Sequence, residues 1–394
     1  MRVLFTCVPF VGHFHPLVPV ARALTNAGHE VAFATHAAIA QFVQRAGFRH
    51  LAAGLHFTSA EMAPIFAEAM QLTGEKHEAF VARRAFAGIL AERMAADLLA
   101  LPEARSADLF VRDNMELGAC IVAERLGRPH AAVSILAAGF QSRWRDMLAG
   151  PLCALRATHG LPSDPALAMP FRYLTLHPCP RRFLAGASFP TDHHVRLEPF
   201  DRSGDEALPA WVGELPRRPT VYATLGTVFN QRTDLFEAFL AALREEPLNL
   251  IVTVGRDQDP AQFGSQPPNV RIERYIPQTL LFPRCDVVLT HGGSGTVMAA
   301  LAHGLPLVIV PLAADHPENA ARCANLGVGR VLEPQDVTPE TIRDAVRTVL
   351  GEQSYRCNAR RLRGEMRALP GPERAVALLE RLAATRQPMV AATR

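Results

Sequence analysis

Short apolar runs alternate with longer amphipathic stretches in the first third of the chain. Residues 3–8 and 30–35 have the apolar content of buried strands, and residues 17–27 between them carry apolar side chains at helical spacing. The same order recurs at 109–135. Because a helix follows each strand before the next one begins, the pattern predicts a mostly parallel sheet with helices on both faces.

A second series of the same kind starts after residue 219. Its strand-like runs are VYATLG, LIVTVG, VRIERY, DVVLT and PLVIVPL, and residues 187–219 before it are rich in proline and charge, as in a linker. We therefore predict an α/β protein with two doubly wound, Rossmann-like domains, at residues 1–200 and 216–370. Ligands of such sheets bind beyond the carboxyl ends of the strands, so the two domains should face each other across a cleft. A last amphipathic helix, 373–390, is expected to pack back on the first domain.

The run HGGSGT, residues 291–296, lies where the apolar strand 287–289 should turn into a helix. Glycines let a ligand approach the main chain, and a helix N-terminus offers unpaired N–H groups and the positive end of a dipole. The pattern is typical of a phosphate or diphosphate site. Taken alone, it fits a tight turn without any ligand equally well.

The composition indicates a globular protein that binds neither nucleic acid nor membrane. The net charge is +3 over 394 residues, and no basic cluster is interleaved with aromatic residues. No apolar run is long enough to span a bilayer, and the chain starts with a strand-like segment instead of a signal peptide. The seven cysteines include no CxxC pair, which argues against a disulfide framework or a zinc site. We expect a cytoplasmic protein.

Two polar residues follow strands of the first series. His13 lies in the loop PFVGHFHPL that should follow the first strand, and Asp113 comes after LFVR. Both strands should end at one edge of the sheet, where a carboxylate can hold the tautomer of a histidine that acts as general base. Each has an ordinary alternative: His13 as a surface histidine and Asp113 as a helix N-cap. His13 and His15 would also start a metal site, but no third ligand lies nearby in the sequence.

Three separated segments resemble one known family. They are residues 11–35, which contain VGHFHPL, residues 108–129, which contain DLFVRDN, and residues 274–320, which contain HGGSGT and DHPENA. These segments are similar to the acceptor-side, second N-terminal and donor-binding motifs of GT-B fold glycosyltransferases of the UDP-glycosyltransferase superfamily, particularly the bacterial branch that decorates natural products. The resemblance covers nearly the whole chain. It implies a GT-B fold enzyme whose partners are a nucleotide sugar and an apolar small-molecule acceptor.

The resemblance also implies roles for individual residues. His13 would be the catalytic base and Asp113 its partner. Tyr275 stands where the family often has a tryptophan that stacks on the nucleobase, and Gln278 where a glutamine reads the edge of the base. Asp315 matches an acid that contacts the sugar hydroxyls. The residues that match the diphosphate-binding positions are Gly226, Thr227, His291, Gly293, Ser294, Gly295 and Thr296.

Two positions near the donor motif depart from the family pattern. His316 replaces the glutamine that commonly follows the sugar-binding acid, and we still count it among the donor-binding residues. Ala299 replaces a glutamate that often contacts the ribose. A dTDP-sugar lacks the 2′-hydroxyl and loses less than a UDP-sugar when that carboxylate is missing. We therefore predict a dTDP-sugar donor in preference to a UDP-sugar.

The tripeptide DQD at 257–259 matches the DxD motif with which another class of glycosyltransferase binds a metal ion and a diphosphate. It follows a strand and a glycine and precedes a proline, which is typical of a solvated loop. A helix dipole, hydroxyl groups and His291 would neutralise the leaving diphosphate instead. We therefore predict inverting transfer that needs no metal and no cofactor.

The acceptor is expected to lie against the first domain, in segments 55–100 and 135–175. Their large apolar side chains suit a flat apolar molecule, although each of them also suits an ordinary core. They are Phe57, Met62, Phe66, Met70, Phe80, Phe86, Phe140 and Trp144. Two other functions stay open: a nucleotide-sugar epimerase of the same architecture, and a catalytically idle homologue that activates a partner protein. The apolar segments argue against the first, and the presence of His13, Asp113 and HGGSGT argues against the second.

Overall fold

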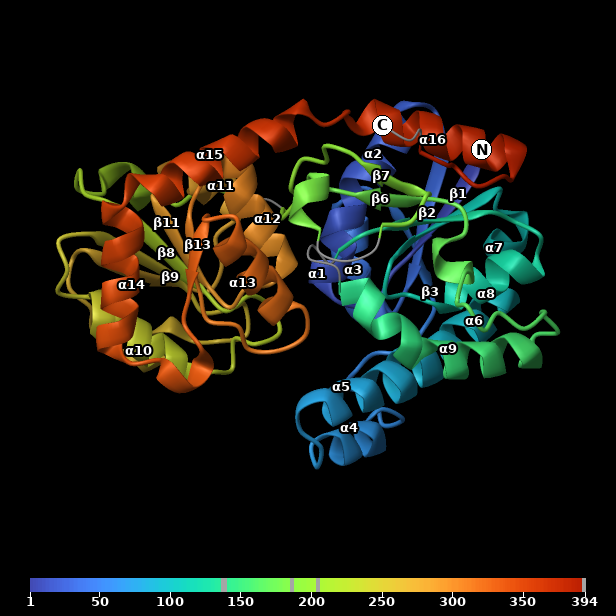
Figure 1. Ribbon diagram of the computed structural model, residues 1–394, viewed down its shortest axis with the longest axis horizontal. Coiled ribbons are helices and arrows are strands. Elements are labelled where there is room, and N and C mark those ends of the chain that lie inside the picture. Colours follow the sequence, from blue (N-terminus) through green and yellow to red (C-terminus); the bar gives the residue numbers. More distant parts are fainter. Residues whose placement is uncertain (136–139, 185–187, 203–205, 392–394) are drawn as a thin grey trace. The chain divides into compact units, whose positions relative to one another are not determined.

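The computed structural model describes residues 1–135, 140–184, 188–202 and 206–391, and its chain forms two compact units (Figure 1). The first unit consists of Met1–Arg181, Gly186–Gly204 and Leu369–Arg394, and the second of Arg182–Ala185 and Asp205–Ala368. Within the described residues, each unit contains one sheet whose neighbouring strands are parallel. This confirms the predicted α/β class with two doubly wound domains.

The sheet of the first unit has the strand order β3-β2-β1-β4-β5-β6-β7 in the described part of the chain. Its strands are β1 (Arg2–Thr6), β2 (Glu30–Thr35), β3 (Arg49–Ala52), β4 (Leu109–Asp113), β5 (His130–Val133), β6 (Thr175–His177) and β7 (Asp192–His194). In β1, Val3 and Phe5 belong to one apolar core and Leu4 to another. Both faces of the sheet are therefore buried, which explains why the strand reads as a continuous apolar run.

Helices cover both faces of this sheet (Figure 1). One core contains side chains of α2 (Val18–Asn26), α3 (Ala40–Arg45) and α16 (Pro372–Thr385). The other contains side chains of η3 (Val81–Leu90), α6 (Ala91–Ala100), α8 (Gly118–Arg125) and α9 (Phe140–Thr158). The shorter helical segments are α1 (Val11–Phe14), η1 (His15–Leu17), η2 (Ala37–Ile39), α4 (Ala63–Ala69), α5 (Gly74–Phe80), α7 (Pro102–Ser106), η4 (Met169–Phe171) and η5 (Arg181–Phe183).

The last helix, α16, lies in the first unit although it follows the whole second unit in sequence. Its buried residues Leu378, Leu379 and Leu382 share a core with Val20 and Leu24 of α2. The amphipathic pattern of its sequence thus corresponds to a face that the first unit covers. No helix in the described part of the chain is both long and apolar enough to cross a bilayer.

Two local expectations were wrong. The segment 187–219 is not wholly a linker, because β7 within it pairs in parallel with β6 at the edge of the first sheet. A strand of three residues offers too few positions for an alternating pattern to be recognised. The residues after β1 do not form an open loop either, because His13 lies on the single helical turn α1.

The sheet of the second unit has the order β10-β9-β8-β11-β12-β13 in the described residues. Its strands are β8 (Thr220–Thr224), β9 (Asn249–Thr253), β10 (Val270–Glu273), β11 (Val287–Thr290), β12 (Leu307–Ile309) and β13 (Gly329–Val331). Its helical segments are η6 (Ala210–Glu214), α10 (Thr233–Leu243), η7 (Pro260–Phe263), α11 (Gln278–Leu281), η8 (Phe282–Arg284), α12 (Ser294–His303), α13 (His316–Asn325), η9 (Pro334–Asp336), α14 (Pro339–Gly351) and α15 (Gln353–Ala368). Helices α10 and α14 share an apolar core with one face of this sheet.

Candidate active site

The structure brings His13 and Asp113 together at the carboxyl edge of the first sheet. Strands β1 and β4 are neighbours, with Thr6 opposite Arg112, so the segments that follow them lie side by side. His13 Nδ1 is 3.3 Å from Asp113 Oδ2. The histidine side chain is 18% exposed and the carboxylate is fully buried. A substrate can therefore reach the imidazole, while the carboxylate behind it is shielded from water.

Backbone N–H groups hold the Asp113 carboxylate in place. Val8 N donates to Oδ2 at 2.8 Å, and Met115 N and Glu116 N donate to Oδ1 at 2.7 and 3.0 Å. These three bonds fix the position of the carboxylate, because each donor points at one of its oxygens. Oδ2 also lies 3.3 Å from His13 Nδ1, a contact whose geometry is not that of a hydrogen bond, so the carboxylate holds the turn and faces the ring.

The helix-capping role considered for Asp113 belongs to Glu116. Helix α8 begins at Gly118, and Glu116 Oε1 accepts from Gly118 N at 2.7 Å and from Ala119 N at 3.2 Å. Thr6 Oγ1 donates to Glu116 Oε2 at 2.5 Å. Burial raises the pKa of Glu116, and the bond from Thr6 opposes that effect. Glu116 was not predicted from the sequence, although the helix dipole favours an acid beside a helix N-terminus.

A row of aromatic rings starts next to the catalytic candidate. The centroid of Phe10 is 5.8 Å from that of His13 and 4.6 Å from that of Phe57. Phe57 in turn lies 5.8 Å from Phe66 and 5.7 Å from Phe86. All four phenylalanines are partly exposed, so the row offers apolar surface close to His13.

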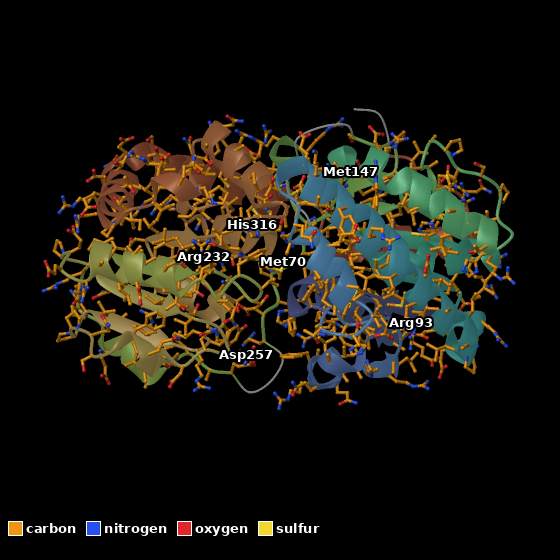
Figure 2. The ribbon with its side chains drawn as sticks, turned by 90° about the horizontal axis from the view of Figure 1, so that it is seen from below. Met70, Arg93, Met147, Arg232, Asp257 and His316 are labelled. Atoms are coloured by element: carbon orange, nitrogen blue, oxygen red, sulfur yellow. The ribbon has the colours of Figure 1, made fainter. Side chains whose placement is uncertain are left out.

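The other apolar residues expected near the acceptor differ in exposure. Met62 is fully buried and is ordinary core, whereas Met70 is 83% exposed (Figure 2). Phe80 is partly buried. The side chains of Phe140 and Trp144 lie outside the described part of the chain.

In the second unit, His291 is enclosed by two glycines at the ends of β8 and β11. A Cβ atom on Gly226 would lie 2.6 Å from His291 Cε1, and one on Gly293 would lie 2.5 Å from Nε2. Gly226 also has a φ of +72°, which other residues rarely adopt. Both positions therefore require glycine for the imidazole to lie where it does. Thr227, next to Gly226, is exposed.

His291 is a neutral hydrogen-bonding group in this structure. Burial lowers its pKa to about 4, and the backbone carbonyl of Thr224 partly offsets that effect. A neutral imidazole donates from one ring nitrogen only. The charge that we predicted from the sequence is thus missing at neutral pH, and the N-terminus of α12 supplies the positive potential instead.

The HGGSGT turn leads into α12 as predicted. Gly293 is the N-cap in extended conformation, and Gly292 before it has a φ of +92°. Gly295, in the first turn, is exposed, and a Cβ there would meet open space. Gln278 Nε2 donates to Thr296 Oγ1 at 3.1 Å, so these two residues are held together behind the turn.

Ser294 and Asp315 are tied to each other inside the unit. Ser294 Oγ donates to Asp315 Oδ2 at 2.7 Å, and Asn319 Nδ2 donates to the same oxygen at 2.8 Å. Asn319 also donates to the carbonyl of Gly292 at 2.9 Å. Burial raises the pKa of Asp315, while the bonds from Ser294 and Asn319 oppose that effect. This network fixes the turn. Its central residue, Asn319, is fully buried and was not predicted from the sequence.

His316 supports the neighbouring loop. Its Nδ1 accepts from Ala313 N at 3.1 Å, and its ring lies edge-on to His291, with centroids 4.6 Å apart. Burial, with a smaller effect from His291, lowers its pKa to about 2. His316 is 3% exposed and is labelled in Figure 2. His316 therefore packs against the ring of His291 and supports it from the loop 312–313.

The remaining donor-site candidates lie around these elements. Tyr275 follows β10 and is half-buried, and Ala299 is a buried methyl group on α12. Asp257 and Asp259 are exposed on the loop after β9, where Asp259 accepts from Ala261 N at 3.3 Å (Figure 2). Among the residues that the structure describes, no group of three or more acidic, histidine or cysteine side chains is placed to hold a metal ion.

The chain is similar to known glycosyltransferases both in sequence and in fold. The family described as "Erythromycin biosynthesis protein CIII-like, C-terminal domain" matches residues 237–382. The 4′-demethylrebeccamycin synthase of Lentzea aerocolonigenes is 33% identical, over 97% of this chain and 99% of its own length. The aclacinomycin-T 2-deoxy-L-fucose transferase of Streptomyces galilaeus is 29% identical over 98% and 96%. The glycosyltransferase VinC, solved in complex with dTDP, has a TM-score of 0.80 at 29% identity and covers 98% of this chain and 100% of its own.

Proposed function

Since the chain belongs to the family of bacterial natural-product glycosyltransferases with the GT-B fold, we propose that it transfers a sugar from a nucleoside-diphosphate donor to a hydroxyl group of an apolar small molecule. The observation that carries this proposal is the pair of His13 and Asp113 at 3.3 Å, partly open to solvent at the histidine and closed at the aspartate. A partly exposed imidazole backed by a buried carboxylate is the arrangement of a general base.

In the proposed reaction the acceptor oxygen attacks the anomeric carbon directly. His13 takes the proton of the acceptor hydroxyl, and Asp113 stabilises the imidazolium that forms. The bond between the anomeric carbon and the diphosphate oxygen breaks as the new glycosidic bond forms, so the configuration is inverted. General base catalysis of this kind contributes about 100- to 10,000-fold to the rate.

The leaving diphosphate is assigned to the N-terminus of α12. Its first N–H groups have no partner within the helix, and its dipole favours an anion. His291, which lies between Gly226 and Gly293, holds the shape of the turn. Because these groups stabilise the departing charge, the proposed reaction needs no metal ion.

The acceptor is assigned to the aromatic row of Phe10, Phe57, Phe66 and Phe86, which begins 5.8 Å from His13. Flat apolar surface suits a polycyclic or macrocyclic aglycone. We propose a dTDP-sugar as donor. The buried methyl group of Ala299 and the relative VinC, solved in complex with dTDP, support this choice.

The test is a transfer assay with the wild type and His13→Ala, using dTDP- and UDP-sugars and a panel of aromatic and macrocyclic alcohols, together with calorimetric titration of dTDP. The wild type should form an inverted glycoside. His13→Ala should lose at least about 100-fold in kcat yet bind dTDP normally, because the base is not part of the diphosphate site.

Addition of EDTA should leave the rate unchanged. Full activity of His13→Ala would remove the proposed base, and a loss restored by Mg²⁺ or Mn²⁺ would contradict metal independence. Epimer formed from donor alone would favour the epimerase alternative.

A further inference from the structure

Arg256, on the loop after β9, lies over the ring of Tyr275. Its guanidinium carbon is 3.7 Å from the centroid of the tyrosine ring. Its Nη2 donates to Glu206 Oε1 at 2.7 Å. Guanidinium groups are planar and stack on aromatic faces much as a nucleobase does. One face of Tyr275 is therefore covered in this structure.

The strand order indicates which face Arg256 covers. Tyr275 follows β10 and Arg256 follows β9, whereas Gly226 and His291 follow β8 and β11. Since β9 lies between β10 and β8 in the sheet, Arg256 reaches Tyr275 from the side of the phosphate turn. A nucleotide with its diphosphate at HGGSGT must approach Tyr275 from that same side.

The backbone around Arg256 is hydrogen-bonded to the neighbouring strand end, and its side chain lies at the surface of the unit. Val254 N donates to Glu273 O at 3.0 Å, and Gly255 N donates to Arg274 O at 2.9 Å, so the two strand ends are in register. The Arg256 side chain is 41% exposed and that of Glu206 is 18% exposed. Exposed ion pairs and cation–π contacts are weak, so a ligand that stacks well can displace the guanidinium.

We propose that Arg256 occupies the nucleobase position on Tyr275 in the unliganded protein, and that a nucleoside diphosphate binds by displacing it. The proposal rests on the proposed function, because it takes Tyr275 as the stacking surface for the base. The loop 255–259 contains the tripeptide DQD, which resembles a metal-binding motif. Under this proposal the loop lowers the affinity for the nucleotide, because Arg256 competes with the base. Glu206 anchors the guanidinium and strengthens the competition.

The test is calorimetric titration of the full chain with dTDP and with inorganic pyrophosphate, which has no base. Arg256→Lys keeps the positive charge and loses the planar group. It should bind dTDP roughly three- to tenfold more tightly than the wild type, since an ammonium cannot stack on the tyrosine ring as the planar guanidinium does. Glu206→Gln should also tighten dTDP binding. Pyrophosphate affinity should stay the same in both variants.

The matched control is Arg347→Lys, because Arg347 is another exposed arginine, with Nη2 2.8 Å from Glu246 Oε1. Its dTDP affinity should equal that of the wild type. Weaker or unchanged dTDP binding by Arg256→Lys would overturn the proposal while the proposed function stands, provided that the wild type binds dTDP and transfers sugar. A wild type that does neither would overturn both.

Discussion

At the scale of single residues, the site depends on buried polar groups that each have two roles. Asp113 accepts three backbone N–H groups and also faces His13. His291 can lie where it does only because Gly226 and Gly293 have no Cβ atom. Substitutions at such positions should therefore alter both the local structure and the chemistry, whereas a substitution of His13 should alter the chemistry alone.

Asp113→Asn separates these two roles. The amide nitrogen of asparagine would replace one acceptor oxygen, so either Val8 N or the turn after Asp113 would face a donor. We expect a loss of about 1–3 kcal/mol in the free energy of unfolding, together with a fall of kcat of at least about 100-fold. Urea unfolding and a transfer assay measure the two effects. His13→Ala is the control and should keep its stability. An Asp113→Asn protein as stable as the wild type would contradict the stated hydrogen-bonding role.

Ala299→Glu tests the choice of nucleotide. Ala299 lies on α12, which starts at the HGGSGT turn, so with the proposed placement of the donor a glutamate there would bring a carboxylate near the ribose. One charge-assisted hydrogen bond contributes about 1.5–3 kcal/mol, so the variant should shift preference toward UDP by roughly tenfold or more. Competition between dTDP and UDP for the free enzyme gives the ratio. If the wild type prefers UDP and the substitution leaves the ratio unchanged, Ala299 does not select the donor.

At the scale of elements, the turn before α12 is a rigid unit built from glycines, His291 and the Ser294, Asp315 and Asn319 network. Gly293→Ala should disturb it without backbone strain, because Gly293 has a φ of −62° that alanine adopts readily. The new Cβ would lie 2.5 Å from His291 Nε2 and would force the imidazole to move.

We expect Gly293→Ala to weaken dTDP binding by about tenfold or more, since the displaced imidazole distorts the turn whose N–H groups are proposed to hold the diphosphate. Gly351→Ala, where a Cβ would meet nothing within 4 Å, is the matched control and should bind dTDP as the wild type does. Titration calorimetry measures both. Equal affinities of the two variants would show that the position of His291 is unimportant for the diphosphate.

At the scale of the whole molecule, two buried histidines connect stability with pH. Burial lowers the pKa of His291 to about 4 and that of His316 to about 2, against about 6.5 in an unfolded chain. Below pH 6.5 the unfolded chain thus binds more protons than the folded one, and the free energy of unfolding falls as the pH falls. Asp315, with its raised pKa, acts in the opposite direction.

His316→Gln isolates one of these groups, because glutamine can still accept from the backbone N–H but does not titrate. Between pH 7 and 5, each histidine should cost the wild type about 2 kcal/mol of stability at most. The variant should therefore lose about that much less over the same range. Urea unfolding at pH 7, 6 and 5 measures the difference. Parallel pH profiles of the two proteins would contradict the burial argument.

The amino-acid sequence by itself determined the class of the fold and the place of the HGGSGT turn, because these depend on local periodicity. Apolar runs that alternate with amphipathic helical segments indicate parallel strands buried on both faces. Glycines after β11 mark the start of α12. It also indicated that His13 and Asp113 would lie at one edge, since each follows a strand of the same sheet.

Only the tertiary structure decided how side chains far apart in sequence combine. The strand β7 exists through pairing with β6, and the neutral state of His291 results from burial that no local pattern records. Asn319 links Ser294 to Asp315, and Arg256 lies on Tyr275 instead of pointing into solvent. The physical reason is common to all four: the energies come from non-local contacts and from exclusion of water, and these arise only when the chain has packed.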